Sequence, residues 1–145
     1  MTRRCIAIDT NMLVSALISD GPPSQIVRRA LAGQISLIVP AIVLIELERV
    51  LIAKLGFAPA RACELVQDVA GACSKCAPTP DDVPVVTGHR PDDEILAAAV
   101  AAGTELLVTG DRRHLLPLVE HEGVQIVTAQ ALLAELTRDE GPTRP

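Results

Sequence analysis

The chain has 145 residues, 49% of them hydrophobic, and a formal net charge of −5 at pH 7. This length and apolar content fit one domain with its own core, which we expect over residues 1–136, followed by a frayed tail over 137–145. The acidic balance excludes a general nucleic-acid coat protein, and one Phe without Trp or Tyr excludes a base-stacking platform. Any nucleic acid would therefore be held by local arginines or by a metal ion.

Membrane and zinc-binding classes also find little support in the sequence. No apolar run approaches the roughly 18 residues of a membrane span, and Cys5 comes too early for a charged leader and an apolar segment to precede it. We therefore expect no membrane association and a cytoplasmic location. The four cysteines include one C-x-x-C pair, CSKC at 73–76, without a second pair, and the histidines are scattered, which favours reduced cysteines over a zinc site.

Short β-branched runs alternate with longer helical patterns along the chain. In chain order these segments are CIAI (5–8), SQIVRRALAG (24–33), ISLIV (35–39), AIVLIELERVLIAKL (41–55), DEILAAAVAAG (93–103), ELLVTGD (105–111), HLLPLVEHEG (114–123), VQIV (124–127) and AQALLAEL (129–136). Such alternation predicts an α/β fold with a mainly parallel sheet and helices on both of its faces. The continuous apolar strands suit burial on both sides.

Proline and glycine mark the ends of the expected helices. Pro23, Pro40 and Pro59 stand where helices are expected to begin, because proline is favoured in the first turn. Gly56 and Gly103 stand where two helices are expected to end.

Acidic residues gather at the ends of predicted strands. Asp9 follows the first strand and Asp111 follows a later one, while Asp92 and Asp93 lie at the first turn of a helix. Open α/β sheets bind ligands at the carboxyl edge of their strands, and a strand-to-helix loop would bring all these acids to that edge. Each acid could instead cap a helix or complement its dipole. Their convergence on one edge favours a functional site.

The helical pattern over 41–55 contains two glutamates. At about 100° per residue, Glu46 falls among apolar neighbours, whereas Glu48 points about 200° further round, toward the side of Arg49. Because an isolated buried carboxylate is costly, we expect Glu46 to face a cation, a polar cleft or a distant arginine. Clustered carboxylates need a cation to stay ionised together, and oxygen ligands without thiolate or imidazole select Mg²⁺ or Mn²⁺.

Four segments in order, IDTNMLVSAL, IELERVL, PDDEILAAAV and LLVTGDRRHLL, make the chain resemble the PIN-domain ribonucleases, in particular the bacterial toxins of VapC-like toxin–antitoxin pairs. The match runs from about Arg4 to Leu136. The resemblance implies a three-layer α/β/α sandwich and Mg²⁺- or Mn²⁺-dependent cleavage of RNA. It also implies a cognate antitoxin. The high apolar content predicts an exposed apolar patch for that partner or for a homodimer.

The resemblance assigns site residues by position. It carries catalytic and metal-binding roles onto Asp9, Glu46, Asp93 and Asp111, with Asn11, Asp92 and Thr109 as supporting polar residues. Many relatives have another Asp shortly after the position of Asp111, where this chain has Arg113 and His114, so we expect one firmly held ion and a weaker second one. Arg90, Arg112 and Arg113 flank the acids as candidate substrate-binding residues, or are simply solvated.

Two other classes remain open. A non-catalytic PIN-fold module would bind RNA or protein and would hold a metal without turnover. A phosphate-transferring aspartate enzyme needs a lysine near its nucleophile, and the only lysines, Lys54 and Lys75, lie beside none of the acidic motifs. We therefore rank that second class below the first.

Overall fold

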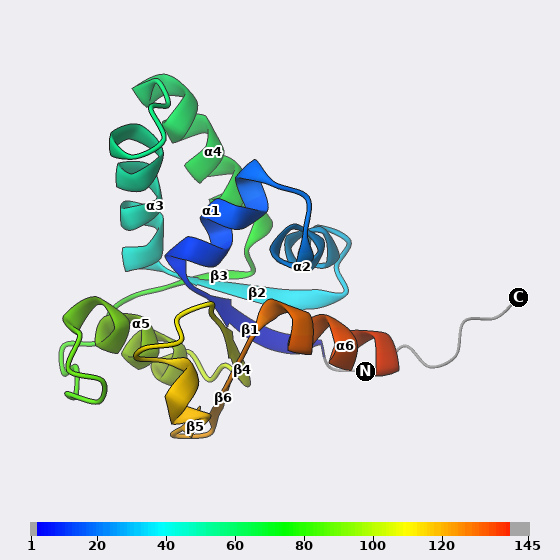
Figure 1. Ribbon diagram of the computed structural model, residues 1–145, viewed down its shortest axis with the longest axis vertical. Coiled ribbons are helices and arrows are strands. Elements are labelled where there is room, and N and C mark those ends of the chain that lie inside the picture. The colour runs from blue at the N-terminus through cyan, green and yellow to red at the C-terminus, as the bar shows by residue number, and fades with distance from the viewer. Residues whose placement is uncertain (1–2, 140–145) are drawn as a thin grey trace, which may run out of the picture.

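A six-stranded sheet runs through the middle of the computed structural model, which describes residues 3–139 (Figure 1). Its strands are β1 (Arg4–Ile8), β2 (Ile35–Pro40), β3 (Lys75–Ala77), β4 (Leu106–Val108), β5 (Glu120–His121) and β6 (Val124–Val127). They lie in the order β3-β2-β1-β4-β6-β5, and all neighbours pair in parallel except β5 with β6. The expected mainly parallel α/β sheet is confirmed.

Helices flank this sheet on both sides. They are α1 (Thr10–Ile18), α2 (Pro22–Leu31), α3 (Ala41–Ala53), α4 (Pro59–Ala72), α5 (Arg90–Ala101) and α6 (Ala129–Asp139), with a short 3-10 helix, η1 (Leu116–Leu118). Figure 1 shows α1, α3 and α4 on one side of the sheet and α5 on the other. Among the described residues, no helix has both the length and the apolar character needed to cross a membrane.

The expected helix boundaries agree with the structure. Pro23 and Pro59 lie in the first turns of α2 and α4, and Pro40 caps α3. Gly56 and Gly103 follow helix ends with φ angles of +72° and +71°, a left-handed backbone that glycine adopts without steric cost.

The central strand β1 is buried on both faces. Ile6 packs in one cluster with Ile26 of α2 and Leu132 of α6, while Ala7 belongs to the larger cluster that also holds Leu96 of α5. Successive strand residues point to opposite faces, so β1 needs apolar side chains throughout. This double burial explains the uninterrupted run that precedes Asp9.

Two regions differ from the expected pattern. Residues 114–123, which resemble a helical segment, form η1 and then β5, because Val119 has φ +62° and Gly123 has φ +84° at the turn into β6. Residues 75–77 add the edge strand β3. At the C-terminus, α6 continues beyond the expected boundary at 136, and Thr137 Oγ1 donates a 2.8 Å hydrogen bond to the Leu133 carbonyl. The remainder of the expected tail, 140–145, lies outside the described residues.

The strand order places a switch point beside β1. The chain passes from β1 to β2 and β3 on one side, and only later to β4 on the other side of β1. Ile8 and Val108 are register partners, so the next residues, Asp9 and Thr109, leave the sheet side by side. Ligands bind at such switch points in open α/β sheets, outside the carboxyl ends of the strands.

Candidate metal centre

Asp9 lies at the end of β1 and serves also as the N-cap of α1. Its Oδ1 accepts a 3.0 Å hydrogen bond from the Met12 backbone, and its Oδ2 accepts one from Thr109 Oγ1. Burial raises the pKa of Asp9 to about 6; the bonds from Thr109 and Met12 oppose this rise, and the charges of Asp92 and Asp111 add to it. The ionised form of Asp9 is therefore disfavoured by its own surroundings.

Asp111 lies in the turn after β4. Its carboxylate accepts hydrogen bonds from the backbone N–H groups of Arg113, His114 and Leu115, each 3.1 Å long, and its own N–H donates to Thr109 Oγ1 at 3.0 Å. Burial alone would raise the pKa of Asp111, but these backbone bonds outweigh it and lower the pKa below its ordinary value. Asp111 is a fixed negative charge.

Asp92 reaches the same centre from the first turn of α5. Burial raises its pKa, the hydrogen bond from His89 opposes that rise, and the charge of Asp111 adds to it. Three carboxylates from separate segments, Asp9, Asp92 and Asp111, thus act on one another electrostatically. This is the group that the structure brings together at the switch point.

Asp93, the next residue, is turned away from that group. It is buried, and its Oδ1 accepts hydrogen bonds from the backbone N–H of Thr87 at 2.8 Å and from the Thr87 hydroxyl at 2.7 Å. Burial opposes ionisation, but the backbone and side-chain bonds from Thr87 and further backbone bonds at Val86 and Gly88 lower the pKa of Asp93. The expected positions of Asp92 and Asp93 are therefore exchanged, because Asp93 holds the loop that leads into α5.

Glu46 approaches from α3. Thr10, which directly follows Asp9, donates a 3.1 Å hydrogen bond from its hydroxyl to Glu46 Oε2. Glu46 is half-buried and Glu48 is exposed, in agreement with the expected phase of this helix. Asn11, a supporting candidate, is an exposed residue in the first turn of α1.

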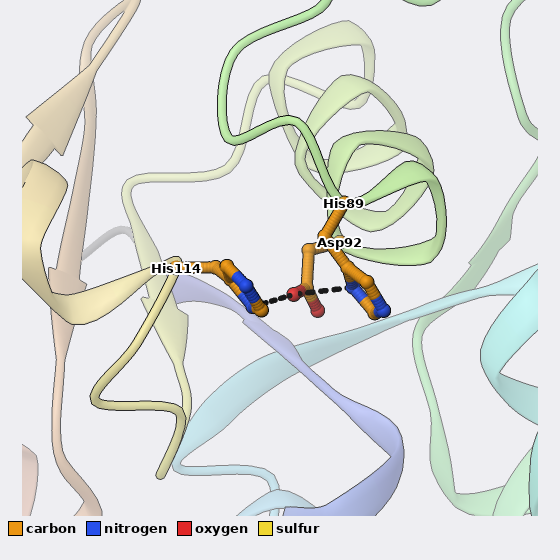
Figure 2. Close-up of side chains that lie close together, drawn as sticks. All are labelled: His89, Asp92 and His114. Carbon is orange, nitrogen blue, oxygen red and sulfur yellow. Dashed lines mark hydrogen bonds and ion pairs between the residues drawn. The ribbon is translucent and has the colours of Figure 1, made fainter.

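Two histidines that looked scattered in the sequence meet at this centre (Figure 2). His89 is the N-cap of α5 and His114 follows Asp111, and their rings stack with centroids 4.8 Å apart and an interplanar angle of 6°. His89 Nδ1 lies 2.8 Å and His114 Nδ1 3.0 Å from the same oxygen, Asp92 Oδ2. The one available signal was spacing, since each histidine lies three residues from an acid of the group.

The three candidate arginines differ in their surroundings. Arg90 donates a 2.8 Å hydrogen bond to Glu94, one turn further along α5, so its charge is partly engaged. Arg112 and Arg113 are exposed and have no ion-pair partner among residues 3–139. The latter two are therefore the more available for a phosphate.

Two cavities lie near the ends of these segments. A cavity of about 160 Å³ adjoins the acidic group and is lined in part by Met12, Thr109 and Arg112. A larger one of about 350 Å³ lies along α5 and contains Asp93 and His121 but none of the three grouped carboxylates. The lining of the smaller cavity also lacks these carboxylates, but it includes Thr109, whose hydroxyl bonds Asp9.

The donor chemistry of this centre fits a divalent cation. Carboxylate oxygens are the ligands that Mg²⁺ and Mn²⁺ prefer, and a cation would stabilise the ionised forms of Asp9 and Asp92, whose pKa values are raised by burial and further by neighbouring acids. Asp9, Asp92 and Asp111 could hold it, and Glu46 is bonded to Thr10, the residue that follows Asp9. The two cysteines of the C-x-x-C pair, Cys73 and Cys76, are free thiols, and among the described residues they belong to no cluster of potential metal ligands.

The fold and the acidic centre define an α/β protein with a carboxylate site at the switch point of a parallel sheet. The family model described as PIN domain matches residues 6–113, and the chain belongs to the PIN-domain family. PIN domains are generally metal-dependent nucleases that bind Mg²⁺ or Mn²⁺ through acidic residues.

A solved structure agrees with this assignment of the fold. The crystal structure of PAE2754 from Pyrobaculum aerophilum superposes with a TM-score of 0.58 at 19% identity, over 95% of this chain and 99% of that one. At this identity the likeness shows the fold. No curated protein matches the chain.

Proposed function

We propose that this protein is a metal-dependent endoribonuclease that hydrolyses RNA phosphodiester bonds. Family membership supports nuclease chemistry in general. The observation that carries the proposal is the grouping of Asp9, Asp92 and Asp111, in which the pKa of Asp9 is raised to about 6 by burial and by the charges of the other two. Such a group is unfavourable by itself and becomes favourable when a cation binds.

The proposed metal ligands are Asp9, Asp92 and Asp111, with Glu46 as a further acidic group. Asp92 takes the place that the resemblance gave to Asp93, because Asp92 faces the other acids and Asp93 is bonded to Thr87. Asp93 is then a positioning residue that fixes the start of α5. The cation would be Mg²⁺ or Mn²⁺.

A bound divalent cation supplies the positive charge that activates a water molecule and stabilises charge on the scissile phosphate. The chain orients the groups that hold it: Thr109 fixes the carboxylate of Asp9, and three backbone N–H groups fix that of Asp111. Arg112 and Arg113 would contact phosphates on either side of the cleaved bond, where their charges offset those of the acids.

The test is cleavage of a mixed RNA pool with Mg²⁺, Mn²⁺ or EDTA. Asp9→Asn is the inactive variant, and Asp20→Asn is the matched control, because Asp20 is an exposed aspartate that pairs with Arg28 away from the centre. We expect cleavage that requires the cation and persists in Asp20→Asn but disappears in Asp9→Asn. Equal inertness of all three proteins, with cation binding retained, would instead favour the non-catalytic binding module.

We further propose that the nuclease is the toxin of a toxin–antitoxin pair and acts in the cytoplasm. Exposed apolar residues support a protein partner: Ile18 at the end of α1 is 53% exposed, and Ile45 on α3 is 70% exposed. The helices α1 and α3 pack against each other, and because both side chains are exposed, an antitoxin or a second copy of the chain could cover them. Induced expression in bacteria should arrest growth for the wild type and not for Asp9→Asn, and light scattering would measure the oligomeric state.

A further inference from the structure

We propose that His89, Asp92 and His114 form a cation position with nitrogen donors, which binds Co²⁺ or Zn²⁺ in preference to Mg²⁺. The position lies at the edge of the acidic centre, where His114 also approaches Asp111 (Figure 2). A catalytic role for this cation position rests on the proposed nuclease function. Binding of a cation to the position can be measured whether or not the protein cleaves RNA.

The two distances from Asp92 to the histidine nitrogens are close to those between neighbouring ligands of one metal ion. Asp92 Oδ2 lies 2.8 Å from His89 Nδ1 and 3.0 Å from His114 Nδ1, and the last atom lies 3.4 Å from Asp111 Oδ2. Bonds of about 2.0–2.1 Å to nitrogen and oxygen place adjacent ligands roughly 3.0–3.4 Å apart in an octahedron or a tetrahedron. One donor atom from each of His89, Asp92 and His114 lies within 4.8 Å of the others.

A cation could reach these donors from the solvent. The side chains of His89 and His114 are 50% and 33% exposed, so solvent has access to the rings. A neutral imidazole offers the lone pair of Nδ1 in place of an N–H bond. Because the two rings are nearly parallel, a turn of His114 about its side chain is needed to direct both lone pairs at one ion.

The donor types determine which cation fits. Mg²⁺ requires oxygen ligands and gives up its water reluctantly, whereas imidazole suits zinc and other first-row transition metals. Asp9 and Asp111 supply oxygen donors for a hard cation, and Asp92, which is also a proposed ligand of that cation, lies against the two imidazoles that supply the softer donors. The centre thus contains donors for two kinds of ion.

The experiment measures binding of Co²⁺, Zn²⁺ and Mg²⁺ to the full chain by titration calorimetry, with the visible absorption of Co²⁺ reporting nitrogen coordination. The variants are His89→Asn and His114→Asn, which keep a polar side chain beside Asp92. The matched control is His121→Asn, since His121 is the third histidine and lies in β5. Melting temperatures in EDTA show whether each variant is folded.

We expect each of the two variants to lose at least about tenfold in affinity for Co²⁺ and Zn²⁺ and to change the Co²⁺ spectrum. Mg²⁺ affinity should change far less, and His121→Asn should behave as the wild type. Folded variants that bind Co²⁺ as tightly as the wild type, with the same spectrum, would overturn the inference and leave the rings as hydrogen-bond partners of Asp92.

RNA cleavage by the wild type, measured with Mg²⁺ and with Mn²⁺, separates this inference from the proposed function. If RNA is cleaved but replacing either histidine leaves Co²⁺ and Zn²⁺ binding unchanged, the nitrogen-donor site is wrong and the proposed nuclease function is supported. If Co²⁺ binding depends on both histidines while no RNA is cleaved with any cation, the nitrogen-donor site is supported and the proposed nuclease function is wrong.

Discussion

Thr109 and Asp9 are joined by a hydrogen bond from Thr109 Oγ1 to Asp9 Oδ2, between the ends of the neighbouring strands β4 and β1. The same hydroxyl accepts a 3.0 Å bond from the backbone N–H of Asp111. Thr109 is completely buried, so neither bond competes with bulk water. The Thr109 side chain therefore fixes the orientation of the Asp9 carboxylate and also the backbone that leads to Asp111.

Replacing Thr109 by Val should cost about 1–3 kcal/mol in free energy of unfolding, because the shape is kept while Asp9 loses a donor and the N–H of Asp111 loses its acceptor. RNA cleavage should fall as well, since the Asp9 carboxylate is freed to rotate. Urea denaturation and cleavage rates measure the two effects. Thr109→Ser keeps the hydroxyl, and if it were as impaired as Thr109→Val, packing of the methyl group would be the cause.

The stability of the metal-free protein should fall as pH rises from about 4 to about 6. The folded state raises the pKa of Asp9 from 3.8 to about 6, so folding favours the protonated form, and this advantage is lost as pH passes through the folded value. A rise of this size corresponds to a loss on the order of 3 kcal/mol at neutral pH. Thermal unfolding in EDTA between pH 4 and pH 8 measures it.

Asp9→Asn supplies the control for this titration. Asparagine is also a good N-cap, so its side-chain oxygen can still accept from Met12 N–H, while the buried charge is removed. The variant should be more stable than the wild type in EDTA at pH 7 and show no such advantage at pH 4. A lower melting temperature at pH 7 would mean that Asp9 serves mainly as a structural cap.

Much of the fold follows from local patterns in the sequence. Short, mainly apolar runs predict strands β1, β2, β4 and β6, and proline and glycine predict the helix ends. Strands β3 and β5 could not be predicted from the sequence. They have three and two residues at the sheet edges, too few to show an alternation of apolar and polar side chains, and they depend on their neighbours for pairing. Residues 114–123 have a helix-like pattern for a related reason: their apolar side chains cover the core, but the segment forms only η1 and β5.

The candidate site was predictable only at the level of segments. Sheet topology places Asp9 and Asp111 together, but which of Asp92 and Asp93 faces them depends on one step of about 100° in the first turn of α5 and on the loop before it. Thr87 decides this by bonding Asp93. The meeting of His89 and His114 likewise depends on two loops, so imidazole was missing from the expected ligands.

Neutralising Asp92 and neutralising Asp93 should therefore have opposite consequences. Asp92→Asn should lower RNA cleavage at least about 100-fold with little loss of stability, because it removes a proposed ligand and relieves repulsion. Asp93→Asn should cost about 1–3 kcal/mol of unfolding free energy and spare most of the activity. Because the folded state lowers the pKa of Asp93, its contribution is present at neutral pH and disappears as pH falls through that lowered value. The reverse pattern of activity would restore Asp93 as the ligand.

The two glutamates of α3 provide a second matched pair. Glu46 accepts the hydrogen bond from Thr10 beside Asp9, whereas Glu48 is exposed. Glu46→Gln should lower cleavage and weaken Mn²⁺ binding about 10- to 100-fold, and Glu48→Gln should change neither. Calorimetry with Mn²⁺ and cleavage assays test this. Equal losses in both variants would show that the charge of the helix, and not the position of Glu46, matters.

Arg112 and Arg113 should contribute to RNA affinity through phosphate contacts. Each exposed guanidinium removed by Arg→Ala should weaken binding and reduce the dependence of log affinity on log salt concentration by about 0.7, the value for one contact to a single strand. The backbone bond from Arg113 to Asp111 survives this change, so the acidic centre keeps its shape. Binding to a short RNA, measured by fluorescence anisotropy with the Asp9→Asn protein at several salt concentrations, gives the slope. Arg61→Ala is the control, because Arg61 pairs with Glu64 on the distant helix α4, and an equal effect there would indicate general charge attraction in place of a defined contact.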